Sequence, residues 1–110
     1  MPHKVEKLLL DIVLSCEETL VFCRNKSFSD FKADRLLQLA IERQFEIMGE
    51  ALYRLEKIDE VNLSQRIPDY RKIIGLRNII AHGYDIVDDR ALWDFVINKV
   101  PSLKDMAERY

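Results

Sequence analysis

Apolar residues recur at every third or fourth position along most of the chain, a spacing that is typical of amphipathic α-helices. The pattern predicts a first helix over about residues 2–23, which the polar residues 25–27 interrupt. A long second helix is predicted to begin near Ser27 or Ser29, either of which can cap it, and to run to about Lys57. No segment alternates convincingly with the two-residue period of a strand.

The second half of the chain predicts shorter helices. Residues 58–69 are interpreted as a connection. A third helix follows over about residues 69–82, and Gly83 is expected to end it in a left-handed conformation.

A fourth helix is predicted to begin at Asp88 or Asp89. Pro101 interrupts it, and Ser102 and Asp105 are spaced as a capping box for a short last helix.

Together these elements predict an all-α fold: an antiparallel four-helix bundle with a short extra C-terminal helix, forming one domain over residues 1–110. The chain has only three glycines and three prolines, which leaves room for long helices. Gly49 lies inside the predicted second helix, where glycine costs stability. We therefore expect another helix to cross closely at Gly49.

Composition and charge narrow the class of protein. The chain is 48% hydrophobic and 33% charged, which is typical of a folded protein rather than a disordered one. Its net charge of −2 argues against a protein that coats nucleic acid through overall basic charge. Basic residues outnumber acidic ones locally between Arg66 and Arg77, but a mixed solvated surface explains this stretch equally well.

Cys16 and Cys23 fall on one predicted helix, two turns and roughly 10 Å of rise apart. A disulfide needs Cα atoms within about 7 Å, so we expect two reduced core thiols and a cytoplasmic location. No segment approaches the ~20 apolar residues of a membrane span, and no membrane association is expected.

The chain has two histidines, His3 and His82, and no Cys-x-x-Cys pair. Neither a metal site nor a phosphate-binding glycine loop is predicted, and no cofactor is expected. If the protein is an enzyme, its acid–base chemistry is therefore expected to depend on His82.

Arg77, Asn78, His82 and Tyr84 place four polar side chains around the end of the third helix. Each helical residue turns by about 100°, so Asn78 and His82, four residues apart, lie on one face of the helix. Arg77 and His82, five residues apart, point to different sides of that face. Pairing of two such helices across a twofold axis could bring both residues of both chains together. The alternative is that His82 caps the helix and Arg77 is a surface charge.

This set of side chains suits cleavage of RNA. An imidazole exchanges protons near neutral pH, and a guanidinium clamps a phosphate in two-point geometry and stabilises developing charge. RNA supplies its own nucleophile, the ribose 2′-hydroxyl, so the reaction requires no metal-bound water.

At these residues the sequence resembles the HEPN superfamily and, within it, the HepT-like toxins. Arg77 is followed by the polar Asn78, as in the superfamily's signature, and Tyr84 completes the Arg-x4-His-x-Tyr form. The segments that also resemble the family are AIERQFEIMGEAL, IPDYRKIIGLRNIIAHGYDIVDD and LWDFVINKVPSL.

The resemblance implies a homodimeric, metal-independent endoribonuclease that acts as the toxin of a toxin–antitoxin module. It implies an antitoxin partner, a minimal nucleotidyltransferase, that attaches AMP to Tyr84. In this scheme His82 is the acid or base, Arg77 clamps the phosphate and Asn78 orients or contacts the substrate. The alternative is a non-catalytic helical dimer that binds the nucleotidyltransferase or a small ligand.

Arg43, Glu46 and Glu50 share one face of the predicted second helix. We interpret them first as a solvated, ion-paired stripe. The second interpretation is that they brace Arg77 or line the groove beside it.

Overall fold

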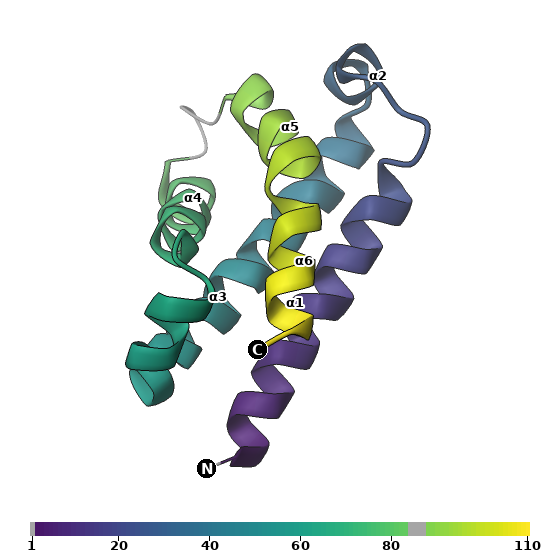
Figure 1. Cartoon of the computed structure of the whole chain (residues 1–110). Coiled ribbons are helices and arrows are strands. Elements are labelled where there is room, and N and C mark those ends of the chain that lie inside the picture. The colour runs from purple at the N-terminus through teal and green to yellow at the C-terminus, as the bar shows by residue number, and fades with distance from the viewer. Residues whose placement is uncertain (1, 84–87) are drawn as a thin grey trace.

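The computed structural model describes residues 2–83 and 88–110, and the side chains of residues 4–81, 83 and 88–110. These residues form helices joined by short turns, which confirms the all-α prediction (Figure 1). The helices are α1 (Pro2–Phe22), α2 (Phe28–Ala33), α3 (Arg35–Arg66), α4 (Tyr70–His82), α5 (Asp89–Asn98) and α6 (Val100–Glu108). The described part of the chain thus has six helices, where four main helices and one short helix were predicted.

Helix α3 is the longest element and organises the others. Helices α1 and α4 both pack against it, and α2 contacts it near its start. Helix α6 follows α5 along one column of the molecule and packs on α1 (Figure 1). As a result, α4 is held to the rest of the structure mainly through α3.

The predicted second helix is in fact two helices, α2 and α3. Asp34 separates them, ending α2 with an extended backbone and capping α3 through a 3.1 Å bond from the Leu37 amide to its carboxylate. The predicted connection over residues 58–69 is wrong, because α3 continues to Arg66. A kink at Asp59 redirects the helix so that Leu63 is fully buried, and the apolar spacing therefore shifts where a connection was expected.

Two predicted helix starts are confirmed. Ser27 caps α2 in a reciprocal capping box with Asp30. The side chain of Asp88 caps α5 by accepting a 2.9 Å bond from the Arg90 amide. Both caps satisfy backbone donors that the first turn of a helix leaves free.

The capping box predicted from Ser102 and Asp105 is wrong. Helix α6 already begins at Val100, with Pro101 in its first turn, where the missing amide proton costs nothing. Ser102 therefore lies inside the helix, and the carboxylate of Asp105 pairs with Arg109 at 3.0 Å.

The core contains the apolar stripes of the helices, and both cysteines lie in it as free thiols. Burial raises the pKa of Cys16 to about 12 and that of Cys23 to about 11, so both thiols stay protonated near neutral pH. Trp93 is buried and packs on Phe31, with ring centroids 5.4 Å apart.

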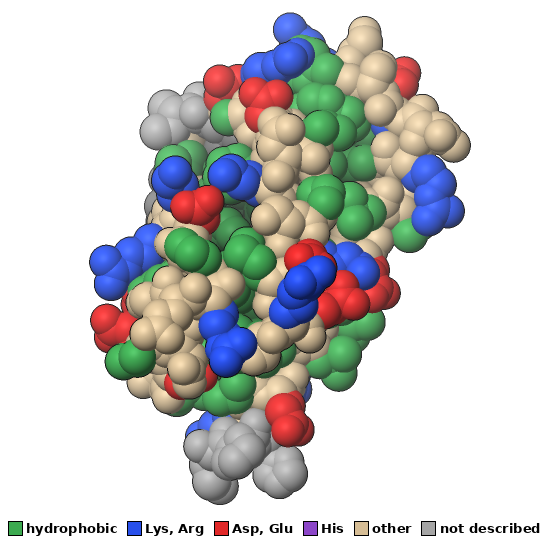
Figure 2. Space-filling view, in the orientation of Figure 1, with side chains coloured by type: hydrophobic (Ala, Val, Ile, Leu, Met, Phe, Trp, Pro, Cys, Tyr) green, Lys and Arg blue, Asp and Glu red, His purple; other side chains and the backbone are tan. Residues whose placement is uncertain are grey.

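The outer surface mixes charges of both signs. Figure 2 shows acidic and basic side chains interspersed over the face seen in Figure 1, without a broad patch of one sign. No helix within residues 2–83 and 88–110 is long and apolar enough to cross a membrane.

Candidate active site at the end of helix α4

Helix α4 carries the residues of the candidate site and ends at His82, close to the predicted position. The Gly83 amide closes the last turn with a 2.7 Å bond to the carbonyl of Ile79. The left-handed conformation predicted for Gly83 is wrong: its φ is −126°. This backbone closes the helix with an ordinary helical hydrogen bond, so no positive φ is needed.

The Arg77 guanidinium is held from two sides. One terminal nitrogen, Nη2, donates a 2.7 Å bond to Oε2 of Glu50 on α3, and Nη1 donates a 2.8 Å bond to Oδ1 of Asn78. The Arg77 side chain is 30% exposed. The guanidinium is therefore fixed in direction and remains reachable from solvent.

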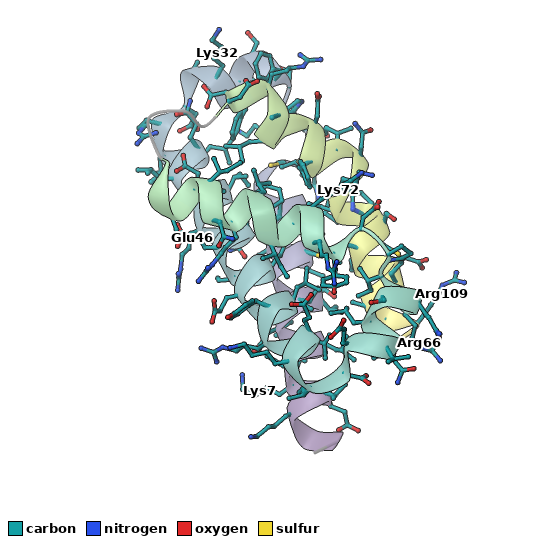
Figure 3. The ribbon with its side chains drawn as sticks, turned by 90° about the vertical axis from the view of Figure 1, so that its left-hand side faces the viewer. Lys7, Lys32, Glu46, Arg66, Lys72 and Arg109 are labelled. Atoms are coloured by element: carbon teal, nitrogen blue, oxygen red, sulfur yellow. The ribbon has the colours of Figure 1, made fainter. Side chains whose placement is uncertain are left out.

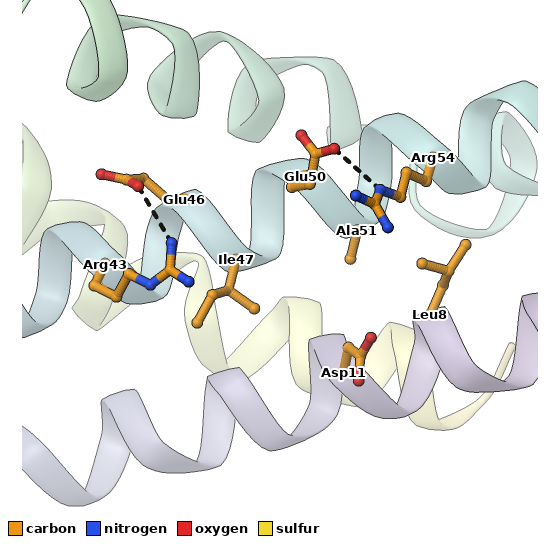
Figure 4. A pocket seen from close by; sticks show the side chains of 8 residues that line it. All are labelled: Leu8, Asp11, Arg43, Glu46, Ile47, Glu50, Ala51 and Arg54. Atoms are coloured by element: carbon orange, nitrogen blue, oxygen red, sulfur yellow. Dashed lines mark hydrogen bonds and ion pairs between the residues drawn. The ribbon is translucent and has the colours of Figure 1, made fainter.

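Glu50 joins two arginines. Its second oxygen, Oε1, accepts a 3.0 Å bond from Nε of Arg54, one turn further along α3. Glu50 thus holds Arg77, as the second interpretation of the helix stripe proposed. Arg43 and Glu46 instead pair with each other at 3.5 Å, as the first interpretation proposed (Figure 4).

Helices α3 and α4 cross at Gly49, which confirms the predicted close approach. A Cβ atom built on Gly49 would overlap the Cβ of Arg77, would lie 2.8 Å from its Cγ, and would approach the Ile73 carbonyl to 3.4 Å. The missing side chain of Gly49 therefore lets α4 come close enough for Glu50 to reach Arg77.

Two glycine substitutions should have opposite effects on stability. Gly49→Ala should lower the free energy of unfolding by about 1–3 kcal/mol, because the crossing is overpacked. Gly75→Ala on α4 should raise it by up to about 1 kcal/mol, because nothing lies within 4 Å of the added Cβ and alanine favours helix. Urea unfolding of the two variants measures the difference, and equal stabilisation by both would contradict the close crossing.

Asn78 is exposed, and its position on α4 defines an outward stripe. Gly75, Asn78, Ile79 and His82 follow the i, i+3, i+4, i+7 spacing of one helix face. Ile79 is 43% exposed on this stripe. The backbone of His82 belongs to α4, whereas its side chain and all of Tyr84 lie outside the described residues.

An open pocket of about 190 Å³ adjoins the candidate site, between α1 and α3 (Figure 4). Its wall includes Arg43, Glu46, Glu50 and Arg54 from α3, and Asp11 from α1. Glu50 both lines this pocket and binds Arg77, so the pocket lies next to the ion pair that holds the guanidinium. Spacing along the chain had not identified Arg54 or Asp11, although Arg54 follows Glu50 by one helical turn.

Among the side chains that the structure describes, no group of three or more His, Cys, Asp or Glu residues is placed to hold a metal ion. The charged groups that converge on α4 form ion pairs instead. Arg77 offers an oriented cation beside the end of a helix, which is suited to holding a phosphate group.

Comparison with known proteins gives a consistent set of relatives. The family model described as "Ribonuclease HepT-like" matches residues 12–110. "Probable ribonuclease HepT" of Thermococcus cleftensis is 37% identical over 99% of this chain and 97% of its own length. A protein of Methanocaldococcus jannaschii that is named provisionally as an RNase is 33% identical over 98% of this chain and 89% of its own. No solved structure matches this chain significantly.

Proposed function

The chain belongs to the HepT-like ribonuclease family, and from this premise we propose that it is a metal-independent endoribonuclease, the toxin of a toxin–antitoxin module. The observation that carries the proposal is the anchoring of Arg77 by Glu50 and Asn78 on the helix that ends at His82. An oriented guanidinium can stabilise the charge that develops on the phosphate, and an imidazole can transfer a proton, so the pair suits RNA cleavage without a metal.

In the proposed reaction, the 2′-oxygen of the ribose attacks the adjacent phosphorus and the bond to the 5′-oxygen of the next nucleotide breaks. The products are a 2′,3′-cyclic phosphate and a free 5′-hydroxyl. Arg77 binds the non-bridging phosphate oxygens as charge develops on them. His82 gives a proton to the departing 5′-oxygen, and the attacking 2′-hydroxyl releases its own proton to solvent. The place of His82 in the last turn of α4 favours the charged imidazolium that such an acid needs.

Cleavage without a metal tests this function. The purified chain should cut a labelled single-stranded RNA in the presence of EDTA and leave cyclic phosphate ends, which gel analysis and phosphatase sensitivity identify. Activity that appears only after Mg²⁺ or Mn²⁺ is added would contradict the proposal.

The proposed site is composite and forms between two subunits. Arg77 and His82 are five residues apart on one helix, so their directions differ by about 140°. In a dimer, the α4 helix of the second subunit could place its own Arg77 or His82 beside the complementary residue of the first subunit. The outward stripe supports this arrangement, because Ile79 offers an exposed apolar side chain beside Asn78.

The dimer can be tested with two matched substitutions. Ile79→Glu should convert the dimer to a monomer and remove activity, since it places a charge in the proposed interface. Leu36→Glu should change neither property, although Leu36 on α3 is even more exposed, at 78%. Sedimentation equilibrium of both variants decides the question, and dissociation by Leu36→Glu alone would move the interface away from α4.

The proposed partner is a minimal nucleotidyltransferase that attaches AMP to Tyr84. Tyr84 follows His82 by two residues. A phosphate and an adenosine attached there would add negative charge and bulk beside the position where the RNA phosphate is held. The attached AMP would thus neutralise the toxin by hindering RNA from binding.

A further inference from the structure

A second pocket continues the one beside Glu50. It has a volume of about 380 Å³ and lies between the start of α1 and the middle of α3. Four cationic side chains and one carboxylate line it: Lys4, Lys7, Arg54, Lys57 and Asp11. We call it the cationic pocket.

The cationic pocket is connected to Arg77 through shared residues. Leu8, Asp11 and Arg54 line both pockets, and the first pocket reaches Glu50, which holds Arg77. The two pockets therefore form one furrow along α1 and α3. Lys7 and Glu46, which come from the two ends of this furrow, project from the same side of the molecule in Figure 3.

Charge changes along the furrow. The first pocket is mixed, with two arginines against three carboxylates. In the cationic pocket four cationic side chains face one carboxylate: Lys7 is bound to that carboxylate, Asp11, at 2.9 Å, and Arg54 is bound to Glu50 at 3.0 Å. This local excess of positive charge stands out on a chain whose net charge is −2.

The surface of the cationic pocket is suited to binding nucleic-acid phosphates without preference for a base sequence. Lys4, Lys7 and Lys57 are exposed and carry flexible point charges, which hold phosphates without fixing base identity. Leu8 and Ile58 provide apolar surface between them. Along α3, Lys57 lies seven residues, or roughly 10 Å, from Glu50, so a strand bound at Arg77 would reach the pocket within a few nucleotides.

We propose that the cationic pocket binds the phosphates of single-stranded RNA that flank the cleaved bond, so that the furrow beside the Glu50–Arg77 pair carries the substrate strand. The proposal rests on the proposed ribonuclease function and assigns the residues that hold the RNA away from the chemistry. These residues should set affinity for long RNA without affecting the reaction itself.

The test removes three charges that no proposed catalytic group contacts. The triple variant Lys4→Gln, Lys7→Gln, Lys57→Gln is compared with Arg24→Gln, Lys26→Gln, Lys32→Gln, which loses the same charge from exposed positions. Lys32 of the control lies at the opposite end of the molecule from Lys7 (Figure 3). Binding of a labelled single-stranded RNA is measured over a range of salt concentrations. His82→Ala is included in every protein so that the RNA stays intact.

The pocket variant should weaken binding and reduce the slope of log affinity against log salt by about 2, since each phosphate contact to a single strand contributes about 0.7. The control should keep the starting slope. With His82 restored, the pocket variant should cleave a dinucleotide, which is too short to reach the pocket, at the wild-type rate.

Three outcomes would overturn the inference. Equal losses in both triple variants would show a general charge effect. An unchanged slope in the pocket variant, with RNA still bound by the starting protein, would show that the pocket does not bind RNA and would favour another partner, such as an acidic protein. Absence of any RNA binding or cleavage by the unmodified chain would remove the proposed function together with the inference.

Discussion

His82→Ala should abolish RNA cleavage, with a loss of about 10²–10⁴-fold in kcat/KM, because the variant lacks the group that transfers the proton. Arg77→Ala should lose about 10²–10³-fold in kcat, because the charge that develops on the phosphate is no longer stabilised. Single-turnover cleavage of a labelled RNA measures both losses. Induction in cells without the antitoxin should arrest growth for the wild type and not for either variant.

The chain offers matched controls for both substitutions. His3→Ala removes the only other histidine and should leave cleavage unchanged. Arg77→Lys keeps the charge but loses the forked geometry that contacts Glu50 and Asn78, and should remain impaired. Growth arrest by His82→Ala equal to that by the wild type would favour the alternative of a non-catalytic helical dimer.

Attachment of AMP to Tyr84 should remove the proposed ribonuclease activity almost completely. When the purified chain is incubated with the nucleotidyltransferase and labelled ATP, the label should be transferred to the chain, and RNA cleavage should disappear as labelling proceeds. The reason is that AMP would add negative charge and bulk two residues after His82, next to the proposed site of the RNA phosphate. Mass spectrometry of the labelled peptide identifies the modified residue.

Tyrosine variants control this experiment. Tyr84→Phe should take up no label, whereas Tyr53→Phe, which alters an exposed tyrosine on α3, should be labelled like the wild type. Label retained on Tyr84→Phe would refute the assignment of the modification site. Full ribonuclease activity of the labelled wild type would refute the mechanism of neutralisation.

Much of the fold could be predicted because periodicity is a local property of the chain. Helices α1, α4 and α5 follow single apolar stripes, and Ser27 and Asp88 cap helices as their types suggest. The continuation of α3 past Asp59 could not be predicted, because its kink changes which residues face the core. Only the packed structure shows that Leu63 is buried there.

Part of the candidate site could likewise be predicted from the sequence, and part depends on how the helices pack. The positions of Arg77 and Asn78 along the chain made them candidates, and Gly49 predicted a helix crossing without indicating which helix crosses there. That the crossing helix presents Arg77 to Glu50 depends on how α3 and α4 pack. The cationic pocket was not predicted at all, since Lys4 and Lys57 are far apart in sequence and only the packing of α1 on α3 brings them to one furrow.

The most direct test of the account replaces one ribose in the substrate. The purified chain is given an RNA carrying a single 2′-deoxyribose on the 5′ side of its preferred cleavage position, with EDTA present, and the unmodified RNA is measured in parallel. We predict that the deoxy RNA stays intact at that position while the unmodified RNA is cut. Equal cleavage of both would mean that the 2′-hydroxyl is not the nucleophile, and would contradict the role assigned to Arg77 and His82.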